Sequence, residues 1–136
     1  MKYVIGIGCD RNTSVQTVKE ALHHVLQQVN IEIHEIVALA TIEKKSEEPA
    51  ILQLAHDLQC PLHIFDAPIL AKVSVPNPSS TVQRYMATPA VAEAAALLGA
   101  QTTMENLILE KYKYRGKDAK HVTLAIACQD MNCANG

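Results

Sequence analysis

The stretch Tyr3-Val4-Ile5-Gly6-Ile7-Gly8-Cys9-Asp10-Arg11-Asn12-Thr13-Ser14 decides the fold of this chain. Its first part, Tyr3 to Ile7, is short, apolar and rich in β-branched residues, which predicts a strand buried on both faces. Gly6 and Gly8 predict a turn after that strand. Glycine accepts a positive φ, and without a Cβ atom it lets a ligand approach the backbone.

The polar end of the same stretch predicts a helix start, with Thr13 or Ser14 as the N-cap. A helix N-terminus that faces a glycine turn presents unpaired N–H groups and partial positive charge, which suits an anionic ligand. The dinucleotide-binding fingerprint needs a third glycine where Arg11 stands, and no Walker lysine follows. We therefore expect a functional crevice here, with a nucleotide as the less favoured ligand.

The composition predicts a single α/β domain. The chain has 136 residues, and 49% of them are hydrophobic but only 4% are aromatic, so the core must consist of Ala, Val, Ile and Leu. A net charge of −2 and the scarcity of aromatic residues argue against nucleic acid as a partner. No leader pattern or membrane-length apolar run is visible, so we expect a cytoplasmic protein with no membrane partner. The four cysteines are then expected to be reduced thiols: Cys9, Cys60, Cys128 and Cys133.

Helical periodicity appears in three longer segments. The first covers residues 15–29, with Asn30 as its C-cap. The second covers 47–58, with Ser46 as the N-cap and Pro49 in the first turn. The third is alanine-rich, which implies close packing on a sheet; we expect Thr88 as its N-cap, Pro89 at N1, Glu93 near its start and Gly99 at its end. Short helical segments are expected after Asp66 and around residues 82–86.

Further strands are predicted at residues 36–40, 62–65, 107–112 and 121–127. Residues 113–120 are too few for a crossover helix, so the last two strands should form a hairpin. The sequence therefore predicts a three-layer α/β/α sandwich over residues 1–128. Its sheet should be mostly parallel, with about five strands and a C-terminal hairpin, and residues 129–136 should form a mobile tail.

Polar segments are expected to meet at the carboxyl ends of the strands, where open α/β sheets bind ligands. Lys45 and Glu48 lie in the polar segment after the second strand, and prolines hold Asn77 in an extended or turn geometry beside Ser79. The hairpin connection carries the basic cluster of the chain, to which Lys111 adds. This cluster is either a solvated loop or a basic rim for a polycarboxylate ligand.

Several segments occur in an order that resembles the CobE / CbiG C-terminal domain family of cobalamin biosynthesis. They are the first glycine stretch, Ala40-Thr41-Ile42-Glu43-Lys44-Lys45-Ser46-Glu47-Glu48-Pro49, Val75-Pro76-Asn77-Pro78-Ser79, Val91-Ala92-Glu93-Ala94-Ala95-Ala96 and Thr123-Leu124-Ala125-Ile126-Ala127. The resemblance covers nearly the whole chain. It implies a three-layer domain that acts on a corrin-ring precursor, or that assists enzymes which do. Full-length CbiG resembles a hydrolase that opens a δ-lactone on a cobalt-precorrin and releases acetaldehyde, whereas CobE-like proteins accompany the pathway without a settled chemical role.

The resemblance also implies a set of site residues. They are Gly6, Gly8, Arg11, Thr13, Ser14, Thr41, Lys45, Glu48, Asn77, Ser79, Thr88, Glu93 and Lys111. Asp10 stands where the family usually has a basic residue, which weakens the case for an anion at the first loop. Glu43 replaces a more frequent aspartate.

Our leading hypothesis is a protein that binds a tetrapyrrole-derived polycarboxylate through first-loop N–H groups with Arg11, Lys45 and Lys111. If the protein is catalytic, Glu48 would activate water for lactone hydrolysis and Lys45 would stabilise the oxyanion. Cys9 is an alternative nucleophile, although we expect it to be a buried spectator. Competing hypotheses are a non-catalytic carrier or partner module, and a nucleotide-binding domain. Neither a cofactor nor a protein-bound metal is expected, and the candidate partners are other cobalamin-pathway enzymes and a second copy of the chain.

Overall fold

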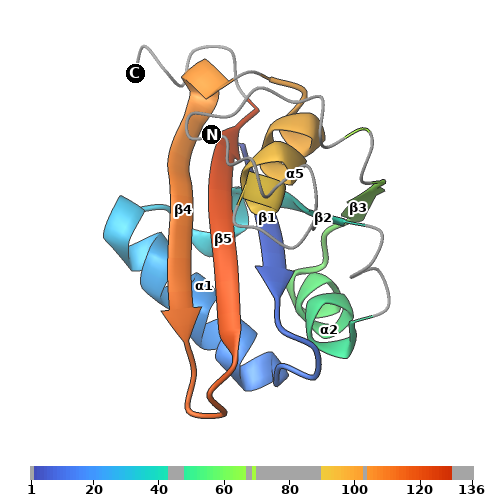
Figure 1. The fold of residues 1–136 in the computed structure, drawn as a ribbon. Coiled ribbons are helices and arrows are strands. Elements are labelled where there is room, and N and C mark those ends of the chain that lie inside the picture. The colour runs from blue at the N-terminus through green and yellow to red at the C-terminus, as the bar shows by residue number, and fades with distance from the viewer. Residues whose placement is uncertain (1, 43–47, 67–68, 70–89, 103, 130–136) are drawn as a thin grey trace.

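The computed structural model describes residues 2–42, 48–66, 69, 90–102 and 104–129. Within them, five strands form one sheet in the order β3-β2-β1-β5-β4. Helices α1 and α2 cover one face of this sheet, and α5 covers the other (Figure 1). The predicted three-layer α/β sandwich is confirmed. Its elements are β1 (Tyr3–Cys9), α1 (Val15–Val29), β2 (Ile36–Ile42), α2 (Pro49–Leu58), β3 (Leu62–Phe65), α5 (Ala90–Ala100), β4 (Leu107–Arg115) and β5 (His121–Cys128), with short 3-10 turns at Ile33–Glu35 and Met104–Asn106.

The sheet is mixed rather than mostly parallel. β1 pairs in parallel with β2, and β2 pairs in parallel with β3. The β4–β5 hairpin is present as predicted, but β5 lies beside β1 and runs antiparallel to it. Because the hairpin joins the sheet next to its first strand, half of the pairings among the described strands are antiparallel.

The helix termini follow local capping rules. Ser14 caps α1 by accepting a hydrogen bond from the Thr17 amide, and Asn30 ends α1 in the left-handed conformation with φ 58°. Helix α2 begins with Pro49, which has no N–H to leave unpaired, and its N-cap is Glu48. The predicted cap Ser46 is therefore wrong. The Ile69 amide donates to the Asp66 carboxylate at 3.1 Å, and the rest of the short helix expected after Asp66 lies outside the described residues.

The predicted glycine turn after the first strand is wrong, because Gly6 and Gly8 both lie inside β1 without a positive φ. A Cβ atom at Gly6 would collide with the carbonyl oxygen of Ala92, so Gly6 lets the α5 backbone pack directly on β1. Gly99 serves the same purpose. It lies inside α5 rather than at its end, and a Cβ there would meet the Val4 side chain at 2.8 Å.

Two hydrophobic cores lie on the two faces of the sheet. Val, Leu and Ile side chains of β1, β5, α1 and α2 build the first, whereas the second is mostly alanine between α5 and the sheet. Small side chains allow α5 to approach closely, as the alanine-rich pattern predicts. The tip of the hairpin packs on α1: a Cβ at Gly116 would collide with Thr17, and the rings of His24 and Tyr114 meet edge to face at 5.1 Å.

Candidate functional site

The loop after β1 is tied to two other segments by carboxylates. The backbone N–H of Asn12 donates to Oε1 of Glu48 at 3.0 Å, and the backbone N–H of Ser14 donates to Oδ2 of Asp118 at 3.1 Å. Asn12 makes the turn itself, with φ 64°. The start of α2 and the hairpin turn thus converge on the carboxyl end of β1. However, the protein's own carboxylates occupy two N–H groups of the first loop, the loop that was predicted to hold an anionic ligand.

Asp118 is held in its ionised form by this arrangement. The Ser14 amide is the largest cause that lowers its pKa below the ordinary value, and the Lys120 amide, which donates to Oδ1 at 3.1 Å, acts in the same direction. An ionised carboxylate beside the first turn of α1 also complements the helix dipole. Asp118 therefore takes the position at the first loop where the sequence predicts an anionic ligand.

Four other predicted site residues are buried inside the fold. The hydroxyl of Thr41 donates to the carbonyl oxygen of Ile7 at 2.8 Å, and that of Thr13 donates to the carbonyl oxygen of Asp10 at 2.6 Å; both threonines are buried. Cys9 is buried in the core beneath α1 and α2, as expected for a spectator. Glu93 is fully buried in the first turn of α5.

The remaining predictions are placed as follows. Arg11 is exposed, and Glu48, the predicted base, is half-buried and bonded to the Asn12 amide. Lys111 lies within β4, but its side chain is not among those described. Lys45, Asn77, Ser79 and Thr88, together with Ser46, Pro89 and residues 82–86, lie outside the described residues. Cys60 is a thiol as expected, whereas Cys128 is disulfide-bonded, so the expectation of reduced cysteines is wrong there.

A second group of residues gathers on the opposite, α5-bearing face of the sheet. Alternate residues of a strand point to opposite faces, and α5 packs against Gly6 of β1 and Ala125 of β5, which are register partners. Two residues further along each strand, Gly8 pairs with Thr123, and Thr123 pairs in turn with Lys113 of β4. Among the described residues, no atom lies within 4 Å of a Cβ built at Gly8.

One more step along the strands, Asp10 lies opposite His121, and His121 pairs with Arg115. We call the six residues of these two transverse rows the α5-side strip: Gly8, Asp10, Lys113, Arg115, His121 and Thr123. Both cations in it are exposed. Because β4 continues to Arg115 instead of ending at Tyr112, Lys113 and Arg115 are presented by a strand rather than by a loop.

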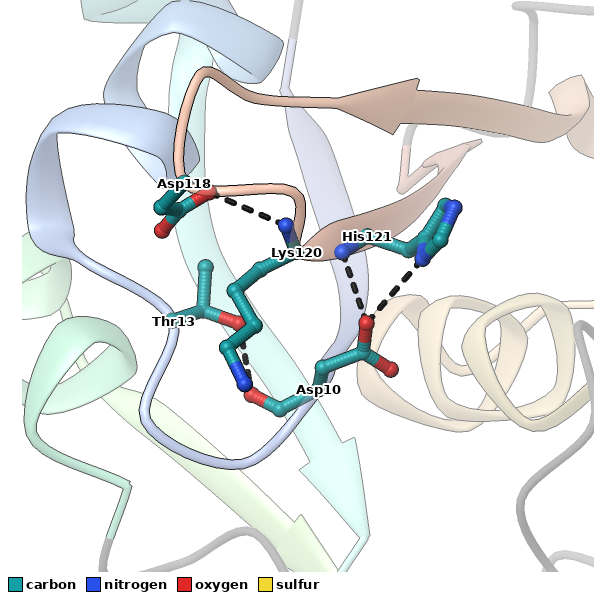
Figure 2. Close-up of polar contacts among 5 residues, drawn as sticks. All are labelled: Asp10, Thr13, Asp118, Lys120 and His121. Carbon is teal, nitrogen blue, oxygen red and sulfur yellow. Dashed lines mark hydrogen bonds and ion pairs between the residues drawn. The ribbon is translucent and has the colours of Figure 1, made fainter.

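Asp10 and His121 form the best-defined polar pair of the strip (Figure 2). Oδ2 of Asp10 accepts from the backbone N–H of His121 at 2.8 Å and lies 3.1 Å from Nδ1 of its ring. The backbone N–H is the largest cause that lowers the pKa of Asp10, with smaller contributions from the ring and from Lys120. Since Asp10 is ionised, Nδ1 carries the proton and Nε2 is left as the second ring nitrogen.

Sequence reasoning missed this pair because the two residues are 111 positions apart. The separate ingredients were visible: a first strand ending near Asp10 and a last strand beginning at His121. Only the register between these strands shows that the two side chains are neighbours.

A cavity of about 650 Å³ lies elsewhere, between α1 and α2. Its walls are largely apolar, from Leu22, Leu26, Ile31, Leu54 and Leu58. Its lysine, Lys19, forms an ion pair with Asp57 at the rim. A polycarboxylate would therefore find little positive charge there.

Other classes of site find no support in the described part of the chain. No three His, Cys, Asp or Glu side chains of these residues are grouped so as to hold a metal ion. None of the described helices is both long enough and apolar enough to cross a membrane. The fold and the strip define a three-layer α/β domain with a positively charged surface beside the carboxyl end of its first strand.

Comparison with known proteins gives the family. Residues 3–127 match the model of the family described as "Cobalamin synthesis G C-terminus", and the chain belongs to this family. The structure resembles the crystal structure of CobE, a protein from the cobalamin (vitamin B12) biosynthetic pathway. That likeness has a TM-score of 0.69 at 28% identity and covers 95% of this chain and 92% of CobE. The predicted resemblance is confirmed.

Two curated relatives carry related names. A cobalt-precorrin-5A hydrolase of Priestia megaterium is 31% identical over 125 residues, which are 90% of this chain and 31% of the hydrolase. Protein CobE of a Sinorhizobium species is 35% identical over 99 residues, covering 71% of this chain and 64% of that protein. The chain thus spans about a third of the hydrolase and less than two thirds of this CobE.

Proposed function

We propose that this chain binds a polycarboxylate intermediate of corrin-ring synthesis, a precorrin or cobalt-precorrin, on the α5-side strip. The observation that carries the proposal is the pair of exposed cations, Lys113 and Arg115, that lie along β4 on the same face of the sheet as Gly8. Arginine pairs with a carboxylate through two parallel hydrogen bonds, and lysine acts as a point charge. The family supplies the class of ligand, because its description and that of the solved CobE structure both refer to cobalamin synthesis.

The first loop supports this proposal less well than the strip. Its N–H groups at Asn12 and Ser14 already donate to carboxylates, so an incoming anion would have to displace Glu48 or Asp118. Displacing an intramolecular carboxylate leaves it unpaired beside the ligand's own negative charges. The strip needs no such displacement, because among the described residues Asp10 is its only carboxylate and already pairs with His121.

Two roles would follow from such binding: assisting the opening of a δ-lactone with release of acetaldehyde, or carrying the intermediate between enzymes. The first is suggested by the hydrolase relative. Because the chain corresponds to 31% of that relative, we propose assistance or carriage rather than hydrolysis by this chain alone. Glu48, the base predicted from the sequence, lies on the other face of the sheet from the strip, so a part for it in lactone opening would require a ligand that also reaches the first loop.

The binding proposal is tested by isothermal titration with two cobalt corrins, cobyrinic acid and cobinamide. The first carries free carboxylates and the second carries amides. We expect cobyrinic acid to bind at least tenfold more tightly, and the Lys113→Gln/Arg115→Gln variant to lose about tenfold, since each exposed ion pair contributes up to about 1 kcal/mol. Lys19→Gln, which removes one positive charge from α1, is the control and should bind as the unmodified chain does. Equal affinity for acid and amide would remove the strip's charges from the site.

The two roles are separated by incubating the protein with the cobalt-precorrin lactone and measuring acetaldehyde. Tight binding without acetaldehyde supports carriage. Acetaldehyde that appears with the chain alone, and disappears in Glu48→Gln, would instead identify a hydrolase.

A further inference from the structure

Asp10 fixes both the backbone and the imidazole ring of His121, which attraction between charges alone would not require. One carboxylate oxygen, Oδ2 of Asp10, holds both the backbone N–H and the ring Nδ1 of His121. In turn, the backbone N–H of Asp10 donates to the carbonyl oxygen of His121 at 3.0 Å, so both residues are fixed in the β1–β5 ladder. The imidazole is thereby anchored at one nitrogen, while its side chain is 61% exposed.

An imidazole whose Nδ1–H is held by a carboxylate is the usual form of a metal-binding histidine. The carboxylate fixes the tautomer, orients the ring and makes Nε2 a better electron-pair donor. In a neutral ring of this kind, Nε2 carries the lone pair. His121 thus has the supporting partner of a metal ligand.

Within the described part of the chain, the surroundings of His121 offer no ordinary metal site and favour a metal that arrives already coordinated. No group of three or more metal-binding side chains exists among the described residues, so His121 would supply a single bond. One bond is what the cobalt of a tetrapyrrole-derived macrocycle needs, because the ring nitrogens fill its equatorial positions and leave only axial ones open. A cobalt corrin is therefore the kind of metal complex that one histidine can hold.

The strip also places charge where such a macrocycle carries its carboxylates. Arg115 is the direct cross-strand neighbour of His121, and Lys113 lies two residues along the same strand. Neighbouring strands are about 5 Å apart, so Arg115 lies beside the imidazole and Lys113 lies diagonally from it on the same strand, somewhat farther away. On the other side of β5, Gly8 presents backbone without a side chain.

We propose that His121, oriented by Asp10, is an axial ligand to the cobalt of a cobalt-bearing corrin intermediate. This inference rests on the proposed function and names its substrate class: the strip selects the cobalt-loaded macrocycle over the metal-free one. His121 is the ligand, and Asp10 is a positioning residue that acts through it. In the bond formed, Nε2 donates its lone pair to cobalt and displaces an axial water, with no change in oxidation state.

The test compares two polycarboxylate corrins, diaquocobyrinic acid, which contains cobalt, and metal-free hydrogenobyrinic acid. With the Co(II) form of the first, the electron paramagnetic resonance spectrum of the bound complex should show cobalt lines split by one nitrogen-14 nucleus. His121→Gln should lose this splitting and bind the cobalt corrin at least tenfold more weakly. The same variant should lose much less affinity for the metal-free corrin, because that corrin offers no cobalt for His121 to ligate, and this remaining binding also shows that the variant is folded.

Asp10→Asn tests the positioning role. It should keep the nitrogen splitting but weaken binding of the cobalt corrin by about tenfold, within the range measured for carboxylates that support metal-bound histidines. Its affinity for the metal-free corrin should not fall, because removing a carboxylate from the strip removes no attraction for a polycarboxylate. Lys19→Gln is again the matched control and should alter neither the splitting nor either affinity.

The outcomes separate this inference from the proposed function. If the protein binds both corrins but shows no nitrogen splitting, or if His121→Gln keeps it, axial ligation by His121 is overturned and the polycarboxylate site stands. If neither corrin binds, the proposed function fails and this inference fails with it.

Discussion

The two faces of the sheet differ at the carboxyl end of β1 in what they leave available to an external anion. On the face covered by α1 and α2, the N–H groups of the first loop are satisfied by Glu48 and Asp118. On the α5 face, Lys113 and Arg115 are exposed beside Gly8, where no atom of the described residues lies within 4 Å of an added Cβ. This difference shows that N–H groups at a helix N-terminus, which could bind an external anion, can instead be satisfied by carboxylates of the same chain. The surface left for an external anion is then elsewhere.

The largest effect is expected at Gly6, where the α5 face is closed. Gly6→Val would drive a side chain into the α5 backbone at Ala92, and packing against backbone cannot relax as a flexible side chain would. We expect the free energy of unfolding to fall by about 3 kcal/mol or more, measured by urea denaturation. A variant as stable as the unmodified chain would show that α5 does not pack on β1 as described.

Gly8→Val is the matched variant at the open position of the same strand. Among the described residues nothing lies within 4 Å of the added Cβ, so stability should change by less than about 1 kcal/mol. If the corrin lies on the strip, the valine should nevertheless weaken binding of cobyrinic acid several-fold in the same titration. Loss of stability equal to that of Gly6→Val would contradict the contrast between the two glycines.

Glu48→Ala probes the other face. It leaves the Asn12 amide without its carboxylate partner, and we expect a loss of about 1 kcal/mol, or about 4 °C in Tm by calorimetry. Affinity for cobyrinic acid should be unchanged, because the strip lies on the opposite face. Weaker binding at unchanged Tm would instead place the ligand at the first loop, as the sequence alone predicts.

The smallest effect concerns acid stability. Asp10 and Asp118 have pKa values below the ordinary 3.8 because backbone N–H groups donate to them. A carboxylate with a lowered folded-state pKa stabilises the fold above its unfolded-state pKa, and this contribution is lost as pH falls through the folded value. Urea unfolding should therefore show stability falling as the pH drops below about 4, less steeply in Asp118→Asn. Identical pH dependence in both proteins would mean that the Ser14 contact does not persist in solution.

Local patterns predict the elements of this fold better than its site. The periodicity of α1 and the capping residues Ser14 and Asn30 are encoded within one short segment, so they are predicted correctly. Gly6 was misinterpreted because glycine serves both turns and close packing, and only the position of α5 distinguishes the two. Lys113 and Arg115 look like loop residues by composition, but pairing with β5 makes them strand.

The candidate site depends on strand register, which a single sequence does not reveal. Asp10 and His121 meet because β5 enters the sheet beside β1, and no local pattern sets that choice. The same holds for Asp118, whose contact with Ser14 depends on how the hairpin tip packs on α1. The prediction that polar segments meet at the carboxyl ends of the strands rests largely on Lys45 and Asn77, which lie outside the described residues. The partners seen at the end of β1, Glu48 and Asp118, are set by tertiary structure.

The position of β5 has a consequence for biosynthesis of the chain. Of the strands that the structure describes, β5 is the last in sequence, yet it lies in the interior of the sheet, between β1 and β4. While the ribosome is still adding the hairpin, β1 can pair with β2 on one side only, and its other edge offers unpaired N–H and C=O groups. Long-range closure of this kind slows folding and exposes nascent chains to aggregation. A chain stalled after α5 should accordingly be a chaperone client, and completion of β5 should release it.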